Sequence, residues 1–427
     1  MRTLSLLFCL VLVTGCASPE PGVHIEDVER IINTLASDDM EGRGSYARGI
    51  RKAADFLSDE FDDIGLGMLE GSDSYLQSFE LYSLSPGAAS VSINGESVEH
   101  SSFFPVGSHE EIAWDDPSHV QVAVVGAEDE LPVAFREARD ATSPTLVLVD
   151  PAHRNMFDRY RAFFGGSVRT GVLNAGAPAL FVLSGARSVS DLSVSIVREA
   201  ETVPMANVVG QITGNRTDEF VLFSAHYDHL GIVQPVDGDS IANGANDNAS
   251  GTTAVVTLAR YFADGPKPER TLLFARFTAE ESGGYGSRHF SEALDPDQIM
   301  AMFNIEMIGK PAVDGPNTAW ITGFDRSTFG QILQAAVEGT AYTFYPDPYP
   351  DQNLFFRSDN ATLARLGVPA HTISTTPIDV DPDYHQVTDE VPTLDLDHLT
   401  NTVKAIAAGA VTIVSGEATP TRVTIEE

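Results

Sequence analysis

The chain has 427 residues, with 61 acidic and 26 basic side chains and a net charge of −35. Hydrophobic residues make up 43% of the chain and charged residues 20%, a balance typical of folded globular proteins that excludes a disordered or fibrous chain. The acidic excess argues against nucleic acid as a partner and against adsorption to anionic membranes, because both need basic patches. At roughly 100–200 residues per domain, this length predicts two or three domains.

The first residues have the composition of an export signal. Arg2 precedes an apolar run, residues 4–13, that is too short to span a bilayer. The run ends in Val-Thr-Gly-Cys at residues 13–16, which resembles the bacterial lipobox, where the cysteine is lipidated and becomes the mature N-terminus. We expect residues 1–15 to be a lipoprotein signal peptide and residues 16–23 a tether. A plain secretory signal with a chance cysteine is the alternative.

Cys16 would then be the sole cysteine of the mature chain, because Cys9 leaves with the signal, so no disulfide framework is expected. The predicted product is an exported bacterial lipoprotein on the periplasmic side of the outer membrane or at the cell surface. Its lipid on Cys16 would be its only membrane attachment. The sequence does not predict the oligomeric state.

Two amphipathic helices and a strand are predicted next. The first helix shows apolar residues at helical spacing from Ile25 to Leu35. The second, residues 50–64, has one apolar stripe and one charged face, and Gly65 is a natural C-cap. Residues 75–82 have the pattern of a strand. We assign residues 24–82 to the first part of a catalytic domain.

Residues 83–203 differ in character and are predicted to be an inserted β-rich domain. Short β-like runs occur at 120–125 and 146–149. The stretch Gly171 to Leu183 is interpreted as a helix end, a turn and a buried strand. It resembles the protease-associated domain often inserted into secreted peptidases, and a plain structural insertion is the alternative.

From residue 204 to residue 427, predicted strands alternate with predicted helices. Strands are expected at 220–224, 271–277, 301–308, 319–322 and 370–374, and helices at 249–262, 284–293, 327–337 and 395–414. This alternation predicts an α/β fold with a mixed, largely parallel central sheet flanked by helices. In such folds the functional site lies at the carboxyl ends of the strands.

Clusters of imidazoles and carboxylates follow the predicted strands or precede a predicted helix. They are SAHYDHLG (224–231), NGANDNASG (243–251), FTAEESGGYGS (277–287), FNIEMIG (303–309) and PDYHQVTDE (382–390). Each alone has an ordinary explanation: a surface histidine, a solvated carboxylate pair or a turn. Together at one sheet edge they would repel one another unless a cation neutralised them, and mixed nitrogen and oxygen ligands suit zinc.

The ordered set of motifs resembles peptidase family M28, the zinc aminopeptidases that share a family with glutamate carboxypeptidase and glutaminyl cyclase. It comprises a His-x-Asp after a strand, an Asp before a helix of small residues, a Glu-Glu pair, an acidic residue in Asn-Ile-Glu-Met-Ile-Gly, and a late Tyr-His. The segment LASDDMEGRGSYARG (35–49) resembles the family's N-terminal region. The resemblance covers residues 24–80 and 206–415 and implies a zinc-exopeptidase-like fold.

The resemblance also implies a site with two Zn²⁺ ions. His226 and Glu306 would hold one ion, Glu281 and His385 the other, and Asp247 would bridge the two. Glu280 would be the general base, and Tyr384 would donate to the developing oxyanion. Asp228 would orient the His226 ring, and Ser358 would support the site from nearby. His229 would lie at the rim of the site or make a surface hydrogen bond.

Position 306 departs from the family pattern, which most often has Asp there. This departure leaves the affinity and identity of that metal open. The resemblance further implies a cis peptide between Asp247 and Asn248. The segment 342–356 could line the pocket for the first substrate side chain or be an ordinary loop.

The leading hypothesis is therefore a metal-dependent aminopeptidase that removes N-terminal residues from peptides. No Gly-x-Ser-x-Gly elbow or His-Glu-x-x-His helix occurs in the sequence, which disfavours serine hydrolase and thermolysin-like chemistry. The alternatives are a glutaminyl cyclase or carboxypeptidase on the same scaffold, and a non-catalytic surface binding protein. The retained Glu280 argues against the last, because binding needs no base.

Overall fold

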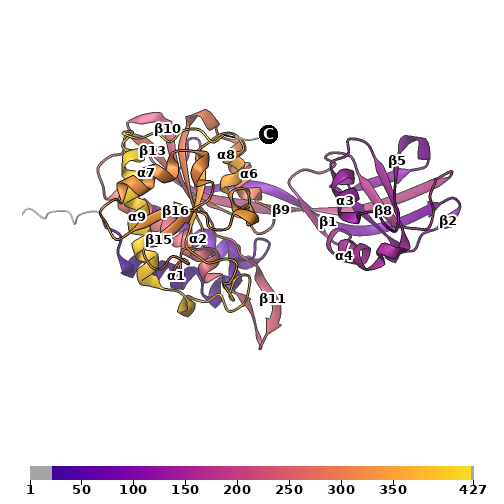
Figure 1. Ribbon diagram of the computed structural model, residues 1–427, viewed down its shortest axis with the longest axis horizontal. Helices are drawn as coiled ribbons and strands as arrows, with labels where there is room; N and C mark the ends of the chain where they lie inside the picture. The colour runs from indigo at the N-terminus through magenta and orange to yellow at the C-terminus, as the bar shows by residue number, and fades with distance from the viewer. Residues whose placement is uncertain (1–21, 425–427) are drawn as a thin grey trace, which may run out of the picture. The chain divides into compact units, whose positions relative to one another are not determined.

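The computed structural model describes residues 22–424, and within them the chain forms two compact units (Figure 1). Among the described residues, the larger unit runs up to Gln77 and resumes at Asn207, and the smaller is Ser78–Ala206. The predicted insertion, 83–203, falls inside the smaller unit. The predicted signal peptide, Cys16 and most of the predicted tether lie outside the described residues. In the described range, no helix combines the length and apolar character needed to cross a bilayer.

A mixed sheet forms the centre of the larger unit. Its strands lie in the order β16 (Thr343–Pro346), β15 (Thr318–Ile321), β17 (Ala370–Ser374), β14 (Ile299–Ile305), β10 (Arg216–His226), β13 (Arg270–Phe277) and β9 (Leu192–Ile212). The four central strands β17, β14, β10 and β13 are parallel. β9 is antiparallel to β13, and β15 is antiparallel to β17. The predicted mixed, largely parallel α/β sheet is confirmed.

Helices cover both faces of this sheet. One face packs against α1 (Ile25–Leu35), α2 (Arg48–Ile64), α5 (Gly251–Ala263), α7 (Phe329–Ala336) and α9 (Leu396–Val414), and the other against α6 (Tyr285–Glu292) and α8 (Asn360–Ala364). Side chains of β10 alternate accordingly. Val221 and Phe223 belong to the first core and Leu222 to the second, and all three are fully buried. Burial on both faces explains why these strands have continuous apolar sequences.

The sequence pattern located the N-terminal helices well. α1 spans the predicted residues, and α2 begins two residues before the prediction and ends at Ile64. Gly65 has a φ of 79°, the left-handed conformation expected of a glycine C-cap. The hairpin of β11 (Gly231–Val236) and β12 (Asp239–Ala242) and the strand β16 were not predicted.

The smaller unit has a four-stranded sheet in the order β3 (Phe103–Val106), β8 (Ala179–Leu183), β6 (Thr145–Val149) and β5 (Gln121–Val125). α3 (Leu131–Arg139) and α4 (Arg154–Phe164) cover one face. The other face packs against the long strands β1 (Leu76–Ile93) and β9, with β4 (Glu111–Trp114). The short strands β2 (Glu96–Ser97) and β7 (Val168–Thr170) both pair with β1. The resemblance of this unit to a protease-associated domain stays a prediction.

Two predicted elements differ from the structure. The strand predicted at 301–308 ends at Ile305, because Met307 has a φ of 51° and a left-handed residue cannot continue a strand. The helix end predicted near Gly171 is absent. α4 ends at Phe164, and Asn174 and Gly176 both have positive φ values, so a turn leads directly into β8.

Candidate metal centre

The parallel strands bring the predicted site residues to one edge of the sheet. β10 ends at His226, Glu306 follows the last residue of β14, and Glu280 and Glu281 come shortly after β13. Because these three strands are parallel neighbours, their carboxyl ends meet. Asp247 lies in the helical turn Ala245–Ser250 before α5, and His385 lies in the loop between β17 and α9.

Asp247 lies between two histidines. Its Oδ1 is 3.4 Å from His226 Nε2, and its Oδ2 is 3.2 Å from His385 Nε2. Each histidine nitrogen also faces one more carboxylate. Glu306 Oε1 is 3.1 Å from His226 Nε2, and Glu281 Oε2 is 3.3 Å from His385 Nε2. The five side chains therefore form two half-sites that share the Asp247 carboxylate.

These separations fit two zinc ions. A tetrahedral ion about 2.0–2.1 Å from each nitrogen and oxygen ligand holds neighbouring ligand atoms about 3.3 Å apart. The four nitrogen–oxygen distances, 3.1 to 3.4 Å, all match this spacing. The donor set of imidazole and carboxylate is also the set that zinc accepts.

The hydrogen bonding of His226 prepares it as a ligand. Its Nδ1 lies 3.1 Å from the backbone carbonyl oxygen of Asp228, and a carbonyl can only accept, so Nδ1 donates the proton. A zinc ion bound at Nε2 would take the place of the proton on that nitrogen and would be shared with the two carboxylate oxygens that face it. Burial lowers the pKa of His226, but its contacts with Asp247 and Glu306 outweigh burial and raise the pKa well above the usual value.

Asp228 thus orients His226 through its main chain. The Asp228 carboxylate is 3.8 Å from the ring nitrogen and instead accepts hydrogen bonds from Ser45 Oγ at 2.7 Å and the Glu280 backbone N–H at 3.1 Å. It therefore fixes the backbone that carries Glu280. Ser45, in the N-terminal segment of the predicted resemblance, was not singled out from the sequence.

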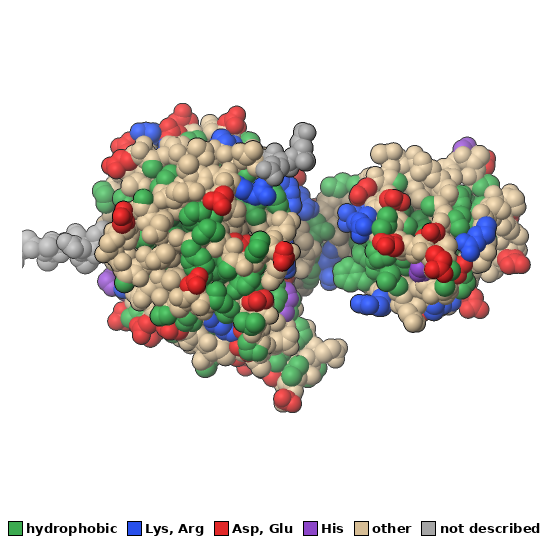
Figure 2. All heavy atoms as spheres, in the orientation of Figure 1, with side chains coloured by type: hydrophobic (Ala, Val, Ile, Leu, Met, Phe, Trp, Pro, Cys, Tyr) green, Lys and Arg blue, Asp and Glu red, His purple; other side chains and the backbone are tan. Residues whose placement is uncertain are grey.

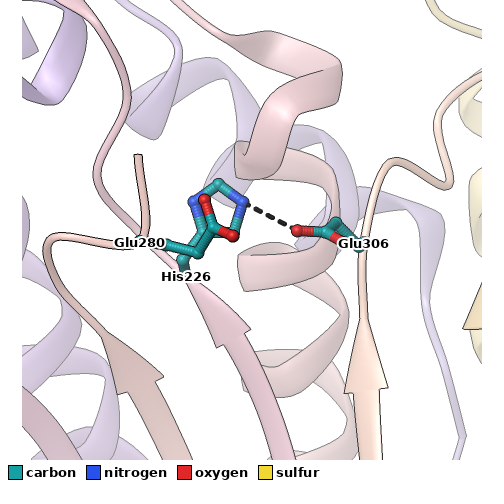
Figure 3. Close-up of side chains that lie close together, drawn as sticks. All are labelled: His226, Glu280 and Glu306. Atoms are coloured by element: carbon teal, nitrogen blue, oxygen red, sulfur yellow. Dashed lines mark ion pairs between the residues drawn. The ribbon is translucent and has the colours of Figure 1, made fainter. Parts of the chain in front are cut away.

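Glu280 approaches the half-site of His226 and Glu306 (Figure 3). One ligand atom from each of these three residues lies within 4.8 Å of the other two. Burial raises the pKa of Glu280 well above its usual value, and the charges of Glu306 and Asp359 raise it further. Glu280 itself is half-buried and lines the cavity beside these residues, so a ligand in that cavity can reach its carboxylate.

His229 is buried in the site rather than exposed. Its Nδ1 lies 2.9 Å from Glu281 Oε1, while Glu281 Oε2 faces His385. Burial and the charge of Asp247 raise the pKa of Glu281, but the two histidine contacts outweigh them and lower it. His229, Asp247 and Glu281 form a second group with ligand atoms within 4.8 Å of one another. His229 fixes the Glu281 carboxylate beside His385.

Two residues missed by sequence reasoning hold the Asp247 turn. The Asp389 carboxylate accepts the backbone N–H groups of Asn246 at 2.9 Å and Asp247 at 3.0 Å. Arg43 is fully buried and donates to the carbonyl oxygens of Leu35, Tyr227, Asn243 and Gly244 at 2.6 to 2.9 Å. Asp389 could have been found from the sequence, because it lies in the motif PDYHQVTDE. Nothing in the sequence around Arg43, in the segment 35–49, indicated its role.

The backbone around the site is unusual in two respects. The peptide bond between Asp247 and Asn248 is cis, as predicted. Three non-glycine residues next to site residues have positive φ: Ala279 at 58°, Met307 at 51° and His385 itself at 58°. Such conformations persist where surrounding structure enforces them, commonly at functional sites.

A cavity opens at the metal-ligand cluster. Besides the cluster, its lining includes Trp320, Leu354, Arg357, Ser358, Ile378 and Tyr384. Leu354 is the part of the segment 342–356 that reaches it, whereas Tyr342 and Phe344 are buried in the core. Trp320 and Arg357 were not singled out from the sequence.

The two other predicted site residues both reach this cavity. The Tyr384 ring stacks on His385 with centroids 4.0 Å apart. Burial raises the pKa of Tyr384, and the charges of Asp247 and Glu281 raise it further, so its hydroxyl keeps its proton and can donate a hydrogen bond. Ser358 Oγ accepts a hydrogen bond from Asn304 Nδ2 at 2.7 Å. Ser358 is thus anchored to β14 rather than bonded to a candidate ligand.

The chain is similar in sequence to known aminopeptidases and zinc metalloproteases. Leucine aminopeptidase 2 of Trichophyton equinum is 27% identical over 196 residues, which cover 43% of this chain and 36% of that protein. A probable zinc metalloprotease of Pyrenophora teres f. teres (strain 0-1) is 32% identical over 119 residues, covering 27% of this chain and 25% of that protein. The chain therefore matches about a third or less of the length of these relatives.

Solved structures show the same fold at low sequence identity. An aminopeptidase from Aneurinibacillus sp. strain AM-1 superposes with a TM-score of 0.55 at 18% identity, covering 95% of this chain and 96% of that one. A zinc aminopeptidase from Bacillus subtilis gives a TM-score of 0.57 at 15% identity, covering 93% and 97%. The predicted fold class is confirmed.

The model of peptidase family M28 matches residues 207–410, the span that carries all five candidate ligands and Glu280. The match confirms the resemblance predicted from the ordered motifs. Residues 207–410 of this chain are a domain of peptidase family M28.

Proposed function

We propose that the protein is a zinc aminopeptidase with two metal ions, which removes N-terminal residues from peptides. The observation that carries this proposal is the position of Asp247 between His226 and His385, each of which also faces its own glutamate. His226 and Glu306 would hold one zinc ion, His385 and Glu281 the other, and Asp247 both.

When bound, the zinc ions would supply Lewis acidity at the scissile carbonyl and lower the pKa of the attacking water. Glu280 takes the proton from that water and delivers it to the leaving amine. Its adjacent residue Glu281 is held by His229 and His385, which leaves Glu280 as the free carboxylate of the pair. These contacts support the proposed division of roles.

Tyr384 is placed to assist when negative charge develops on the carbonyl oxygen. It lines the cavity beside His385 and keeps its hydroxyl proton, so it can donate a hydrogen bond to that oxygen. Stacking on His385 limits the directions that its ring can take.

The cavity accommodates the first residue of the substrate. Trp320, Leu354 and Ile378 give it an apolar wall close to the metal-ligand cluster. An apolar N-terminal side chain would contact this wall, and the scissile carbonyl would then lie beside Glu280. We therefore propose substrates with apolar N-terminal residues.

The direct test is turnover of aminoacyl anilides and free peptides by the purified chain loaded with zinc. We expect release of apolar N-terminal residues, and loss of activity with a chelator that zinc restores. No turnover of any anilide or peptide would overturn the proposal. Cyclisation of N-terminal glutamine peptides with one zinc per chain would favour a glutaminyl cyclase, and release from the carboxyl end would favour a carboxypeptidase.

We also propose that the protein is exported and lipidated on Cys16. This proposal rests on the lipobox-like residues 13–16, which lie outside the described residues. Metabolic labelling with a fatty acid tests it in a bacterial host. The wild-type chain should be labelled and recovered with membranes, and Cys16→Ser should be unlabelled. Labelling of neither chain would contradict the proposal.

A further inference from the structure

A second groove continues from the metal centre. Its lining shares Glu280, Arg357 and Ser358 with the cavity described above and extends to α6 and the end of α8. There it gains Arg288, on α6, and Arg365, directly after α8. Contacts between α6 and α8 place these two elements side by side (Figure 1). Three guanidinium groups therefore surround one groove.

This gathering of cations is unusual in so acidic a chain. The sequence has more than twice as many acidic as basic residues. Yet Glu280 is the one acidic residue among the described residues that line the groove. Basic side chains also lie on the surface where Figure 1 shows α6 and α8 (Figure 2). The groove is locally basic on a protein of net charge −35.

The three arginines are exposed and lack ionic partners. In the part of the chain that the structure describes, no carboxylate lies within 4.0 Å of Arg288, Arg357 or Arg365. Arg288 donates to the Gly283 carbonyl at 3.3 Å, and Arg357 makes a single 3.5 Å contact with Gln352. Since each guanidinium carries five N–H donors, most remain available to a ligand.

Aromatic rings hold two of these guanidinium groups in place. Arg365 lies over the Phe356 ring at 5.1 Å, and Arg288 over the Tyr285 ring at 5.5 Å. Such contacts stabilise a cation without consuming its hydrogen-bond donors. A planar group with free paired donors is suited to bind a carboxylate through two parallel hydrogen bonds.

The position of Glu280 tells which part of a substrate enters this groove. A general base that returns its proton to the leaving amine must lie within hydrogen-bonding distance of that nitrogen. The apolar wall of Trp320, Leu354 and Ile378 belongs to the first cavity only, and the arginine groove starts at Glu280. The leaving part of the peptide therefore extends along the arginine groove.

We propose that Arg288, Arg357 and Arg365 form a subsite for a carboxylate on the leaving part of the peptide. The proposal rests on the aminopeptidase function proposed above. Two sources supply this chemistry: the C-terminal carboxylate of a dipeptide or tripeptide, and an acidic side chain just after the scissile bond. In either case the arginines determine specificity and take no part in bond cleavage.

Matched peptide pairs test the subsite. Leu-Gly-Gly against its C-terminal amide measures the contribution of the terminal carboxylate. Leu-Asp-Gly-amide against Leu-Asn-Gly-amide measures that of an acidic side chain. We expect kcat/KM to favour the carboxylate member of at least one pair by about tenfold, and the preference to fall as ionic strength rises. The pair that shows the preference identifies the source.

Variants connect the preference to the groove. The double variant Arg288→Gln, Arg365→Gln should reduce the carboxylate-to-amide ratio of kcat/KM to about one. Arg51→Gln, on an exposed part of α2, is the control and should leave the ratio unchanged. An equal ratio for both pairs in the wild-type chain would overturn the subsite, and so would a preference that survives the double variant.

Failure of the subsite and failure of the proposed function remain distinguishable. Efficient cleavage of all four peptides without preference refutes the subsite alone. If none is cleaved, the aminopeptidase proposal fails, and binding of the same four peptides to the uncleaving protein is measured by calorimetry. Tighter binding of the carboxylate members that the double variant abolishes would then support the subsite, and equal binding would refute it.

Discussion

The Glu306 carboxylate reaches His226: its Oε1 lies 3.1 Å from the ring Nε2, slightly closer than the other three nitrogen–oxygen pairs at 3.2 to 3.4 Å. The extra methylene relative to aspartate is therefore accommodated. Glu306 directly follows β14, and its backbone N–H donates to the Ile373 carbonyl at 3.1 Å, which fixes the main chain there. With the main chain held at this position, the longer side chain of glutamate brings its carboxylate to His226.

Shortening this side chain should weaken one metal site selectively. In Glu306→Asp the carboxylate falls short of the ion, so we expect zinc affinity at that site to fall by about tenfold or more, while the second site is little changed. Zinc titration by calorimetry measures both. Glu338→Asp, an exposed position, is the control. Two sites of wild-type affinity in Glu306→Asp would show that Glu306 is not a ligand.

Replacing the proposed base should separate catalysis from metal binding. Glu280→Gln removes proton transfer but leaves the five proposed ligands, so turnover should fall roughly 10²–10⁴-fold with two zinc ions still bound. Glu281→Gln should instead lose zinc, because it removes a ligand. Metal content and turnover are measured on both variants. Loss of one zinc ion in Glu280→Gln would show that Glu280 is itself a ligand in the half-site of His226 and Glu306.

Arg43 should be critical for stability although it contacts no substrate. Arg43→Lys keeps the charge but cannot reach all four carbonyl oxygens that the guanidinium satisfies, so buried acceptors lose their partners. We expect a loss of about 3 kcal/mol in the free energy of unfolding, measured in urea, and weaker zinc binding because the Asp247 turn moves.

Arg48→Lys provides the matched control. Arg48 is exposed and pairs with Glu41 at the surface, where ion pairs contribute little. Its replacement should change the free energy of unfolding far less than the replacement of Arg43. Equal effects of the two substitutions would contradict the structural role of Arg43.

His371 should make stability depend on pH. Burial lowers the pKa of His371 to about 4 from its usual 6.5, while its Nδ1 donates to the Thr322 carbonyl and its Nε2 accepts from Ser327. Between pH 4 and pH 6.5, the imidazole of His371 is therefore protonated in the unfolded chain and neutral in the folded chain. The stability from the neutral ring is complete above pH 6.5 and is lost as pH falls toward 4, by about 3 kcal/mol.

Urea unfolding at pH 7 and pH 4 checks this expectation. His371→Gln should be less stable than wild type at pH 7, yet lose about 3 kcal/mol less between the two pH values. His24→Gln, at an exposed position, should follow the wild-type curve. The same pH-dependent loss in His371→Gln and wild type would contradict the assignment.

The sequence predicted those elements whose apolar pattern is set by burial, on one face for the helices and on both faces for the central strands. α1 and α2 carry apolar stripes at helical spacing, and β10, β13 and β14 are continuous apolar runs because both faces are covered. β16 and the hairpin of β11 and β12 were missed because they are short and mostly half-buried or exposed.

The candidate metal ligands were predicted from ordered motifs, but the residues that hold their backbone in place were not. His226, Asp247 and Glu306 stand next to strands or a helix of clear pattern. Arg43 looks like any surface arginine in the sequence. Its burial depends on the carbonyl oxygen at the end of α1 and on three loop carbonyl oxygens, which converge only in the fold. Arg288 and Arg365 are 77 positions apart, so their common groove is likewise a product of tertiary packing.

The most direct test of the central claim is an anomalous-scattering crystal structure of the zinc-loaded protein, recorded at the zinc edge. The account predicts two peaks about 3.5–4 Å apart. Asp247 should bridge them, with His226 and Glu306 on one ion and His385 and Glu281 on the other. A single peak, or two peaks without Asp247 between them, would contradict it.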